Sequence, residues 1–189
     1  MEIEVVRWLN SGVGKYAWSD ALVGSLASEY LIPVFGSLCL LGLWFWGNSE
    51  TRHQNQLTTI AGALAIGIAN LLTLQINQTY FRARPFIEHE LNLLFYRPTD
   101  SSFPSNSAAI AFAISSAIFI RYRSLGMVLF VVSIIYGLSR VYAGVHYPSD
   151  IVGGALIGIT MGFISQGAIT LCSPLFKRLF KIFRSFYLA

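Results

Sequence analysis

The chain has 189 residues and a net charge of +4, and 54% of its residues are hydrophobic whereas only 12% are charged. Soluble domains contain about a quarter charged residues, so this composition excludes an ordinary soluble protein. We predict an all-α membrane helix bundle of about five transmembrane helices that forms a single domain over residues 1–189.

The first ten residues predict a short amphipathic helix ahead of the first long apolar run. Its apolar positions are Ile3, Val5, Val6, Trp8 and Leu9. We predict that this helix lies in the membrane interface, although the pattern fits an extension of the first bundle helix about equally well. Glu2 and Glu4 stand where a cleavable signal peptide needs a basic start, so we expect the segment to remain in the mature protein.

Five apolar runs follow, most of them near the roughly 20 residues that cross a bilayer. They are Ala21–Ser28 with Tyr30–Asn48, Gln54–Phe81, Ser101–Ile120, Leu125–Ser139 and Ile151–Phe176. The run Leu125–Ser139 is the shortest and gives only about 22 Å of helix. We therefore expect a short fourth span that holds Arg140 below the lipid headgroups.

Five spans place the two termini on opposite sides and put the loops 80–104 and 140–150 on the same side. Seven lysines and arginines then fall on the C-terminal side and six on the other. Arg84 and Arg140 resemble site residues and are left out of a topology count, so the bias favours a cytoplasmic C-terminus and an outward-facing site.

The C-terminal segment carries much of the positive charge. Its basic residues Lys177, Arg178, Lys181 and Arg184 alternate with Phe176, Leu179, Phe180, Phe183 and Phe186. This pattern favours an anionic lipid leaflet over nucleic acid as a partner. Cys39 and Cys172 each lie in an apolar run, which predicts neither a disulfide nor a metal site.

The most informative motif follows the fourth apolar run, where Ser139-Arg140 precedes His146 and Asp150. Arginine presents a planar fork that suits phosphate oxygens, histidine is a nucleophile near neutral pH, and a carboxylate holds an imidazole in one tautomer. The spacing therefore predicts phosphoryl transfer through His146. A structural histidine at a helix start is the alternative, and an interface anchor is the alternative for Arg84 and Arg140.

Two helix starts are predicted beside the proposed site. Pro104 precedes Ser105-Asn106-Ser107 and an alanine-rich run, and Pro148 precedes Ser149-Asp150 and an apolar run, so each proline fits the first turn of a helix. Helix N-termini bind anions through free N–H groups. Two of them on one side strengthen the prediction of a phosphate site.

Two polar residues inside apolar runs have competing interpretations. Glu29 is costly in lipid unless it is paired, which favours a site role or an arginine partner over a helix cap at the interface. Asn77, near the end of the second run, fits substrate contact and interhelical hydrogen bonding equally well.

Three motifs together resemble the type-2 phosphatidic acid phosphatase superfamily. They are Arg84-Pro85, Pro104-Ser105-Asn106-Ser107, and Ser139-Arg140 with His146 and Asp150. The segments Tyr80–Phe86, Ser102–Ser105, His146-Tyr147-Pro148 and Glu29-Tyr30 make the chain most similar to the bacterial undecaprenyl-pyrophosphate phosphatases.

The resemblance implies metal-free hydrolysis through a phosphohistidine, with no cofactor. It implies that His146 attacks the phosphorus and that Asp150 orients and polarises the imidazole. Substrate oxygens would be held by Arg84, Arg140, Ser105 and the backbone N–H groups near Asn106. Positioning and charge stabilisation then supply most of the catalysis.

The chain departs from the family pattern at two positions. Asn77 stands where the family often has a lysine, and Arg82 is a candidate to supply the missing charge at the phosphate. Ser107 stands where the family has the histidine that protonates the leaving oxygen. Loss of such a general acid costs about 10²–10⁴ in rate, so turnover is expected to be weakened. An engineered trap, a variant with another proton source and a binder without turnover are the three explanations, of which the first is favoured.

The function expected from these residues is hydrolysis of undecaprenyl pyrophosphate to the monophosphate, which recycles a lipid carrier of the cell envelope. A phosphatase acting on phosphatidic acid or phosphatidylglycerophosphate is the alternative enzyme. A non-catalytic lipid-phosphate binder is the alternative from another class. We expect a multi-pass protein of the bacterial cytoplasmic membrane whose site faces the periplasm or exterior and whose partners are lipids.

Overall fold

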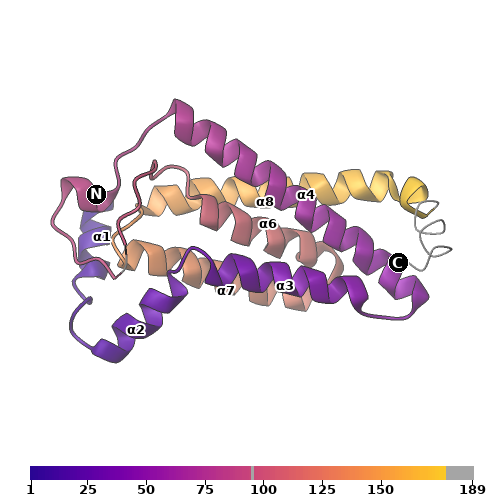
Figure 1. The fold of residues 1–189 in the computed structure, drawn as a ribbon, viewed down its shortest axis with the longest axis horizontal. Coiled ribbons are helices and arrows are strands. Elements are labelled where there is room, and N and C mark those ends of the chain that lie inside the picture. The colour runs from indigo at the N-terminus through magenta and orange to yellow at the C-terminus, as the bar shows by residue number, and fades with distance from the viewer. Residues whose placement is uncertain (95, 178–189) are drawn as a thin grey trace.

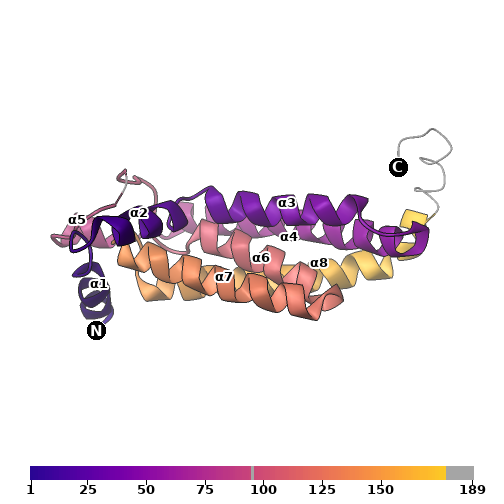
Figure 2. The same cartoon turned by 90° about the horizontal axis from the view of Figure 1, so that it is seen from below.

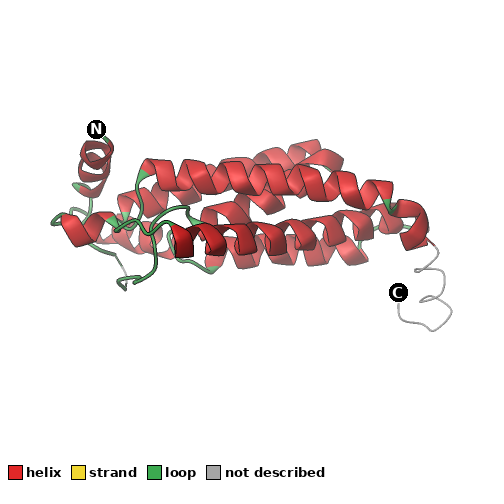
Figure 3. Ribbon diagram, turned by 90° about the horizontal axis from the view of Figure 1, so that it is seen from above, coloured by secondary structure: helices red, strands yellow, loops and turns green. Residues whose placement is uncertain are grey.

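The computed structural model describes residues 1–94 and 96–177, and within these residues the chain forms helices and no strands (Figures 1 and 3). The helices are α1 (Glu2–Asn10), α2 (Ala17–Leu26), α3 (Leu31–Phe45), α4 (Ser49–Thr79), α5 (Pro85–Glu88), α6 (Asn106–Arg121), α7 (Arg123–Tyr142) and α8 (Pro148–Leu171). The predicted all-α membrane bundle is thereby confirmed. The basic C-terminal residues from Arg178 onward lie outside the described part of the chain.

Helix α6 lies at the centre of the bundle, against α4, α7 and α8. Small side chains bring these helices together: Ala65 and Ala69 of α4 pack against Ala109 and Ala113 of α6. The four-residue spacing of Gly154, Gly158 and Gly162 predicts close packing in lipid. The structure confirms it, since a Cβ on Gly158 would lie 2.2 Å from the Ala109 carbonyl oxygen. This contact fixes the N-termini of α6 and α8 relative to each other.

In the described part of the chain, three helices, α4, α7 and α8, are long and apolar enough to cross a membrane, and α2 with α3 adds a fourth span if the bent pair is one crossing. This pair is bent by 50° at residues 27–30. The fifth expected span corresponds to α6, which has 16 residues because the chain up to Ser105 is a loop. The short helix is therefore α6. The expectation of a short fourth span was wrong, since α7 includes both Arg123 and Arg140 and reaches 20 residues.

The loops 80–105 and 143–147 meet at one end of the bundle, together with α1, α2 and α5 (Figure 1). Hydrogen bonds between the two loops, such as that from His146 to the Ser102 carbonyl, confirm that they share one side. We call this the site end. The turns from α3 to α4 and from α6 to α7 lie at the opposite end (Figure 1).

Helix α1 lies across the site end, roughly perpendicular to the long helices (Figure 2). Its Val6 is fully buried in a cluster with Val141 and Tyr147. The alternative that this segment extends the first bundle helix is wrong, because α1 and α2 are separate helices and α1 packs against α7 and α8. The interface location remains a prediction.

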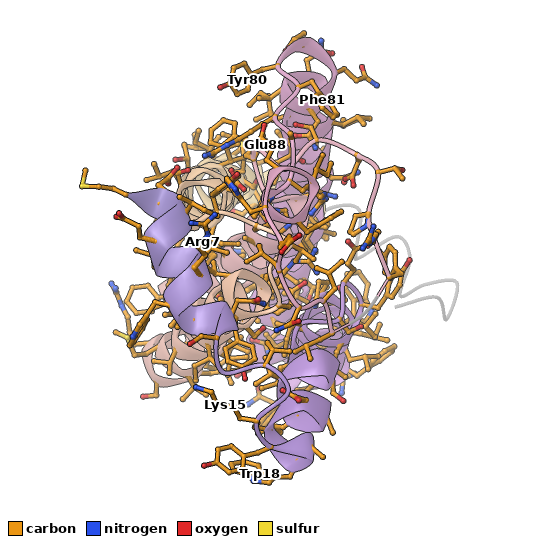
Figure 4. All side chains as sticks on the ribbon, turned by 90° about the vertical axis from the view of Figure 1, so that its left-hand side faces the viewer. Arg7, Lys15, Trp18, Tyr80, Phe81 and Glu88 are labelled. Carbon is orange, nitrogen blue, oxygen red and sulfur yellow. The ribbon has the colours of Figure 1, made fainter. Side chains whose placement is uncertain are left out.

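Exposed aromatic side chains surround the site end. Trp18 of α2 and Tyr80 and Phe81 after α4 lie at the periphery when the molecule is viewed from this end (Figure 4). They are 71%, 58% and 65% exposed. Tyrosine and tryptophan gather at the headgroup level of membranes, so this distribution fits a site that opens near the membrane surface.

Candidate active site

The turn between α7 and α8 carries His146. Gly144 has φ +77°, a conformation that glycine adopts without strain and that lets the chain turn back after α7. Pro148 occupies the first turn of α8, as predicted. Pro104 does not enter α6, because Ser105 is the N-cap and Pro104 precedes it. The Ser105 N–H donates to the Asp150 carbonyl (3.0 Å), which joins the two helix starts at the site.

The His146 imidazole is buried, and its two nitrogens have different surroundings. Nδ1 lies 3.0 Å from the Ser102 carbonyl oxygen, which only accepts hydrogen bonds. Nδ1 therefore carries the proton, and Nε2 is left with its lone pair. Nε2 faces the guanidinium groups of Arg84 and Arg140, each 3.3 Å away, and the Ser105 hydroxyl at 3.4 Å.

The two arginines beside this nitrogen are each held by several hydrogen bonds. Arg84 donates to the carbonyls of Val145 (3.0 Å) and Asp100 (3.1 Å) and to the Asp100 carboxylate (2.8 Å). Arg140 donates to the Ala27 carbonyl (2.8 Å) and pairs with Glu29 (3.1 Å). Both guanidinium groups are buried, at 2% and 1% exposed, so they are fixed before any anion arrives.

The Arg140–Glu29 pair confirms the predicted arginine-pairing role of Glu29. Glu29 lies at the bend between α2 and α3, which carries the carboxylate toward the last turn of α7. Partial neutralisation by one carboxylate lets a buried guanidinium persist while it still attracts an anion.

A cavity of about 260 Å³ opens in front of Nε2. Its lining combines the site residues Glu29, Asn77, Arg84, Asn106, Ser107, Arg140 and His146 with the apolar residues Pro33, Val34 and Ile110, among others. Ser107 lies beside Ser105, with 3.3 Å between the two hydroxyl oxygens. Seven of the residues predicted from sequence thus surround one space.

The two amide residues of this lining are held by neighbouring polar groups. Asn106 donates to the Asn70 side chain (2.8 Å) and accepts from Thr73 (2.7 Å). Asn77, with its amide nitrogen turned toward the Phe103 carbonyl, donates a hydrogen bond of 2.6 Å. Phe103 lies in a loop, so this bond is not the interhelical hydrogen bond that was one of the two interpretations of Asn77. Asn77 also lines the cavity, and its contact with substrate stays a prediction.

Asp150 lies behind the imidazole, on the side away from the cavity. It accepts from the Ser102 hydroxyl (2.5 Å), the Tyr147 N–H (2.7 Å) and Arg82 (2.6 Å). Its carboxylate is 3.6 Å from Nδ1, so the nearer partner of the imidazole is the Ser102 carbonyl. Arg82, predicted to contact substrate, is bound to Asp150 and is not among the residues that line the cavity.

Sequence reasoning missed three residues of the site. Ser102 contacts both His146 and Asp150, Asp100 fixes Arg84, and Glu2 pairs with Arg82 (2.7 Å). Ser102 was available as part of the family-like segment before Ser105, although its hydroxyl had no assigned role. The positions of Glu2 and Asp100 follow no motif spacing.

Burial lowers the pKa of His146 to about 4, and the positive charges of Arg140 and Arg84 lower it further against the opposing effect of Asp150. The imidazole is therefore neutral across the physiological range. A neutral imidazole with a free Nε2 is the form that attacks phosphorus.

Removal of one of these charges is expected to raise the pKa of His146. In Arg84→Gln the pH midpoint at which the His146 ring becomes protonated moves to a higher value. The imidazolium then has one neighbouring guanidinium, that of Arg140, where it had two. Titration by NMR measures this shift, and the chain has only three histidines to assign. Arg52→Gln, at the opposite end of the bundle, is the control and leaves the midpoint unchanged. An unchanged midpoint in Arg84→Gln would show that its charge does not act on Nε2.

Comparison with known proteins agrees with this geometry. The model of the PAP2 superfamily matches residues 58–172. Undecaprenyl-diphosphatase BcrC of Bacillus subtilis is 36% identical over 137 residues, which cover 72% of this chain and 68% of the relative. Bacitracin transport permease protein BcrC of Bacillus licheniformis is 29% identical over 160 residues, or 84% and 76% of the two chains.

The solved structure of Aquifex aeolicus LpxE superposes with a TM-score of 0.69 at 29% identity, over 87% of this chain and 93% of that chain. The matched family segment contains Arg84, Arg140, His146 and Asp150. Because the family model matches more than half of the chain, this protein belongs to the PAP2 superfamily and is a lipid phosphatase.

Proposed function

We propose that this protein hydrolyses undecaprenyl pyrophosphate to undecaprenyl phosphate through a phosphohistidine at Nε2 of His146. The convergence of Arg84, Arg140 and Ser105 on Nε2, all within 3.4 Å, is the observation that carries the proposal. A tetrahedral phosphate in the cavity would meet a nucleophile and two fixed cations at the same point. The name of the Bacillus subtilis relative supports the choice of substrate.

In the first step, Nε2 forms a bond to the terminal phosphorus while the bond from phosphorus to the bridging oxygen breaks. The bridging oxygen takes the electron pair and leaves as undecaprenyl phosphate. Arg84 and Arg140 stabilise the charge on the three equatorial oxygens. In the second step, water attacks the same phosphorus, the P–N bond breaks and returns its electrons to Nε2, and inorganic phosphate leaves.

The residue at position 107 favours a pyrophosphate substrate. A serine hydroxyl donates a hydrogen bond but is a poor general acid at neutral pH. The leaving group of a pyrophosphate is itself a phosphate and departs with negative charge, whereas phosphatidic acid must release an alkoxide-like oxygen. Ser107 therefore impairs the second reaction more than the first.

The cavity also fits a phosphate that is attached to a lipid. Its polar lining surrounds Nε2, and its apolar residues Pro33 and Val34 belong to α3, a helix with many exposed apolar side chains. We propose that the headgroup enters near the membrane surface while the prenyl chain stays in lipid. The proposal includes a single domain in the bacterial cytoplasmic membrane, with the site facing the periplasm or exterior.

A direct comparison of substrates tests this function. We expect the purified protein in mixed micelles to release phosphate from undecaprenyl pyrophosphate at least about tenfold faster than from phosphatidic acid, because the second substrate lacks an acidic leaving group. Equal or faster release from phosphatidic acid or phosphatidylglycerophosphate would assign the alternative phosphatase. Saturable binding of either lipid without phosphate release would assign the non-catalytic binder.

A further inference from the structure

We propose that Arg82 and Glu2 position the Asp150 carboxylate, so that the N-terminal helix α1 is a working part of the active site. Neither side chain lines the substrate cavity, and Arg82 binds the Asp150 carboxylate directly. The role rests on the proposed function, since it assumes that Asp150 serves the reaction of His146. It makes Arg82 a positioning residue and not a ligand of the substrate phosphate.

Arg82 connects the two acidic residues. Its Nη1 donates to Asp150 Oδ1 (2.6 Å) and to the Ser149 hydroxyl (2.7 Å), and its Nη2 donates to Glu2 Oε2 (2.7 Å). The guanidinium carbon lies 4.2 Å from the centre of the Tyr147 ring, within the range of a cation–π contact. Arg82 is thereby held on several sides, at the start of α8.

Both oxygens of Asp150 are occupied as a result. Oδ1 is taken by Arg82, and Oδ2 accepts from Ser102 and the Tyr147 N–H. A carboxylate that is bound at only one oxygen rotates, whereas one bound at both is fixed in its plane. Ser102 also places its carbonyl on Nδ1 of His146, so the orientation of Asp150 determines the orientation of the imidazole.

Glu2 binds the helix start by a second route. Its Oε1 accepts from the Ser149 N–H (3.1 Å) while its Oε2 holds Arg82. The hydrogen bonds from Ser149 and Arg82 and the charge of Arg82 lower the pKa of Glu2 against the opposing effect of its partial burial. Glu2 is therefore ionised at neutral pH and balances the charge of Arg82.

Helix α1 is fixed at both ends and along one face. At its C-terminal end, buried Asn10 donates to the carbonyls of Asn92 (2.8 Å) and Tyr142 (2.9 Å) and accepts from the Asn92 N–H (2.9 Å). Between these ends, Val6 is buried against Val141 and Tyr147. An anchored helix delivers Glu2 to one place, which a flexible N-terminus would not.

The test compares Glu2→Gln with Glu4→Gln, a matched change on the same helix whose side chain is 76% exposed. We expect Glu2→Gln and Arg82→Gln to lower kcat by about 10- to 100-fold, because a displaced catalytic group reacts poorly. KM stays within about twofold, since neither residue contacts substrate. Glu4→Gln leaves both constants unchanged. Glu2→Gln in the Arg82→Gln background causes no further loss, because the substituted amide still accepts from the Ser149 N–H and the only interaction lost is the ion pair with Arg82.

Three results would overturn the proposal: a raised KM with unchanged kcat in Arg82→Gln, equal behaviour of Glu2→Gln and Glu4→Gln, or additive losses in the double variant. A measurement without turnover separates this inference from the proposed function. The NMR signals of the His146 ring are expected to shift in Glu2→Gln and Arg82→Gln but not in Glu4→Gln. If no lipid phosphate were hydrolysed, this shift would still establish the positioning role, and its absence would disprove it.

Discussion

Replacement of His146 with alanine is expected to abolish phosphate release, with a loss of at least about 10⁴-fold in kcat. Removal of the nucleophile leaves only substrate binding and charge stabilisation to accelerate the reaction. A water molecule in the place of the imidazole would be a weaker nucleophile than Nε2. Phosphate release and trapping of an acid-labile phosphoenzyme both measure this loss. The phosphoenzyme is expected in the parent chain and not in the variant.

The matched control for this change is His89→Ala, in the loop after α5, which is expected to retain parental turnover. Arg84 and Arg140 remain in place in His146→Ala, so lipid binding should persist while turnover is lost. Activity of His146→Ala near the parental level would show that another group attacks phosphorus. Loss of binding together with turnover would indicate that the substitution damaged the cavity. A structure of the variant would then show whether the Arg140–Glu29 ion pair is still present.

Replacement of Ser107 with histidine is expected to raise the rate by at least about tenfold. Ser107 lines the cavity in front of Nε2, so an imidazole at this position reaches the leaving oxygen and donates a proton to it. The gain should be larger with phosphatidic acid than with undecaprenyl pyrophosphate, because the poorer leaving group depends more on protonation. Initial rates on both lipids at neutral pH measure the difference.

Ser107→Ala serves as the control for the gain, since it removes the hydroxyl without adding an acid and should lower the rate only slightly. If Ser107→His fails to raise the rate on either lipid, the interpretation of position 107 as a vacated general-acid site is wrong and the non-catalytic binder is favoured. If the double variant with Ser107→His and His146→Ala loses the gain, the added general acid acts in the reaction that uses His146 as nucleophile.

Much of the bundle and the centre of the site could be predicted from the sequence. The apolar runs correspond to α2 with α3, α4, α6, α7 and α8. They could be recognised because long uncharged segments must be placed in lipid or in the protein interior. Arg140 lies in the last turn of α7 and His146 in the turn that follows, so their proximity followed from their spacing in the sequence. Glu29 was expected to pair with an arginine because an isolated carboxylate in an apolar segment is costly, and it pairs with Arg140.

The lengths and boundaries of the helices were harder to predict from the sequence. The sequence predicted a short fourth span, whereas α6 is the short helix and α7 has 20 residues. A hydropathy pattern ends a predicted span at a charged residue. Arg140 nevertheless lies within its helix, because its guanidinium binds the Ala27 carbonyl and the Glu29 carboxylate. Pro104 was likewise assigned to a helix that begins two residues later, at Asn106.

What the sequence determined by itself is which residues form the centre of the site: a histidine, two arginines and a carboxylate at spacings that a turn, the end of a helix and a loop can bring together. Only the tertiary structure decided that Arg82 binds Asp150 and does not line the cavity, and that Glu2, from the N-terminal end of the chain, binds the same arginine. The physical reason is that periodicity specifies neighbours within a helix or turn, whereas contacts between distant loops depend on how whole helices dock, here α1 across the start of α8.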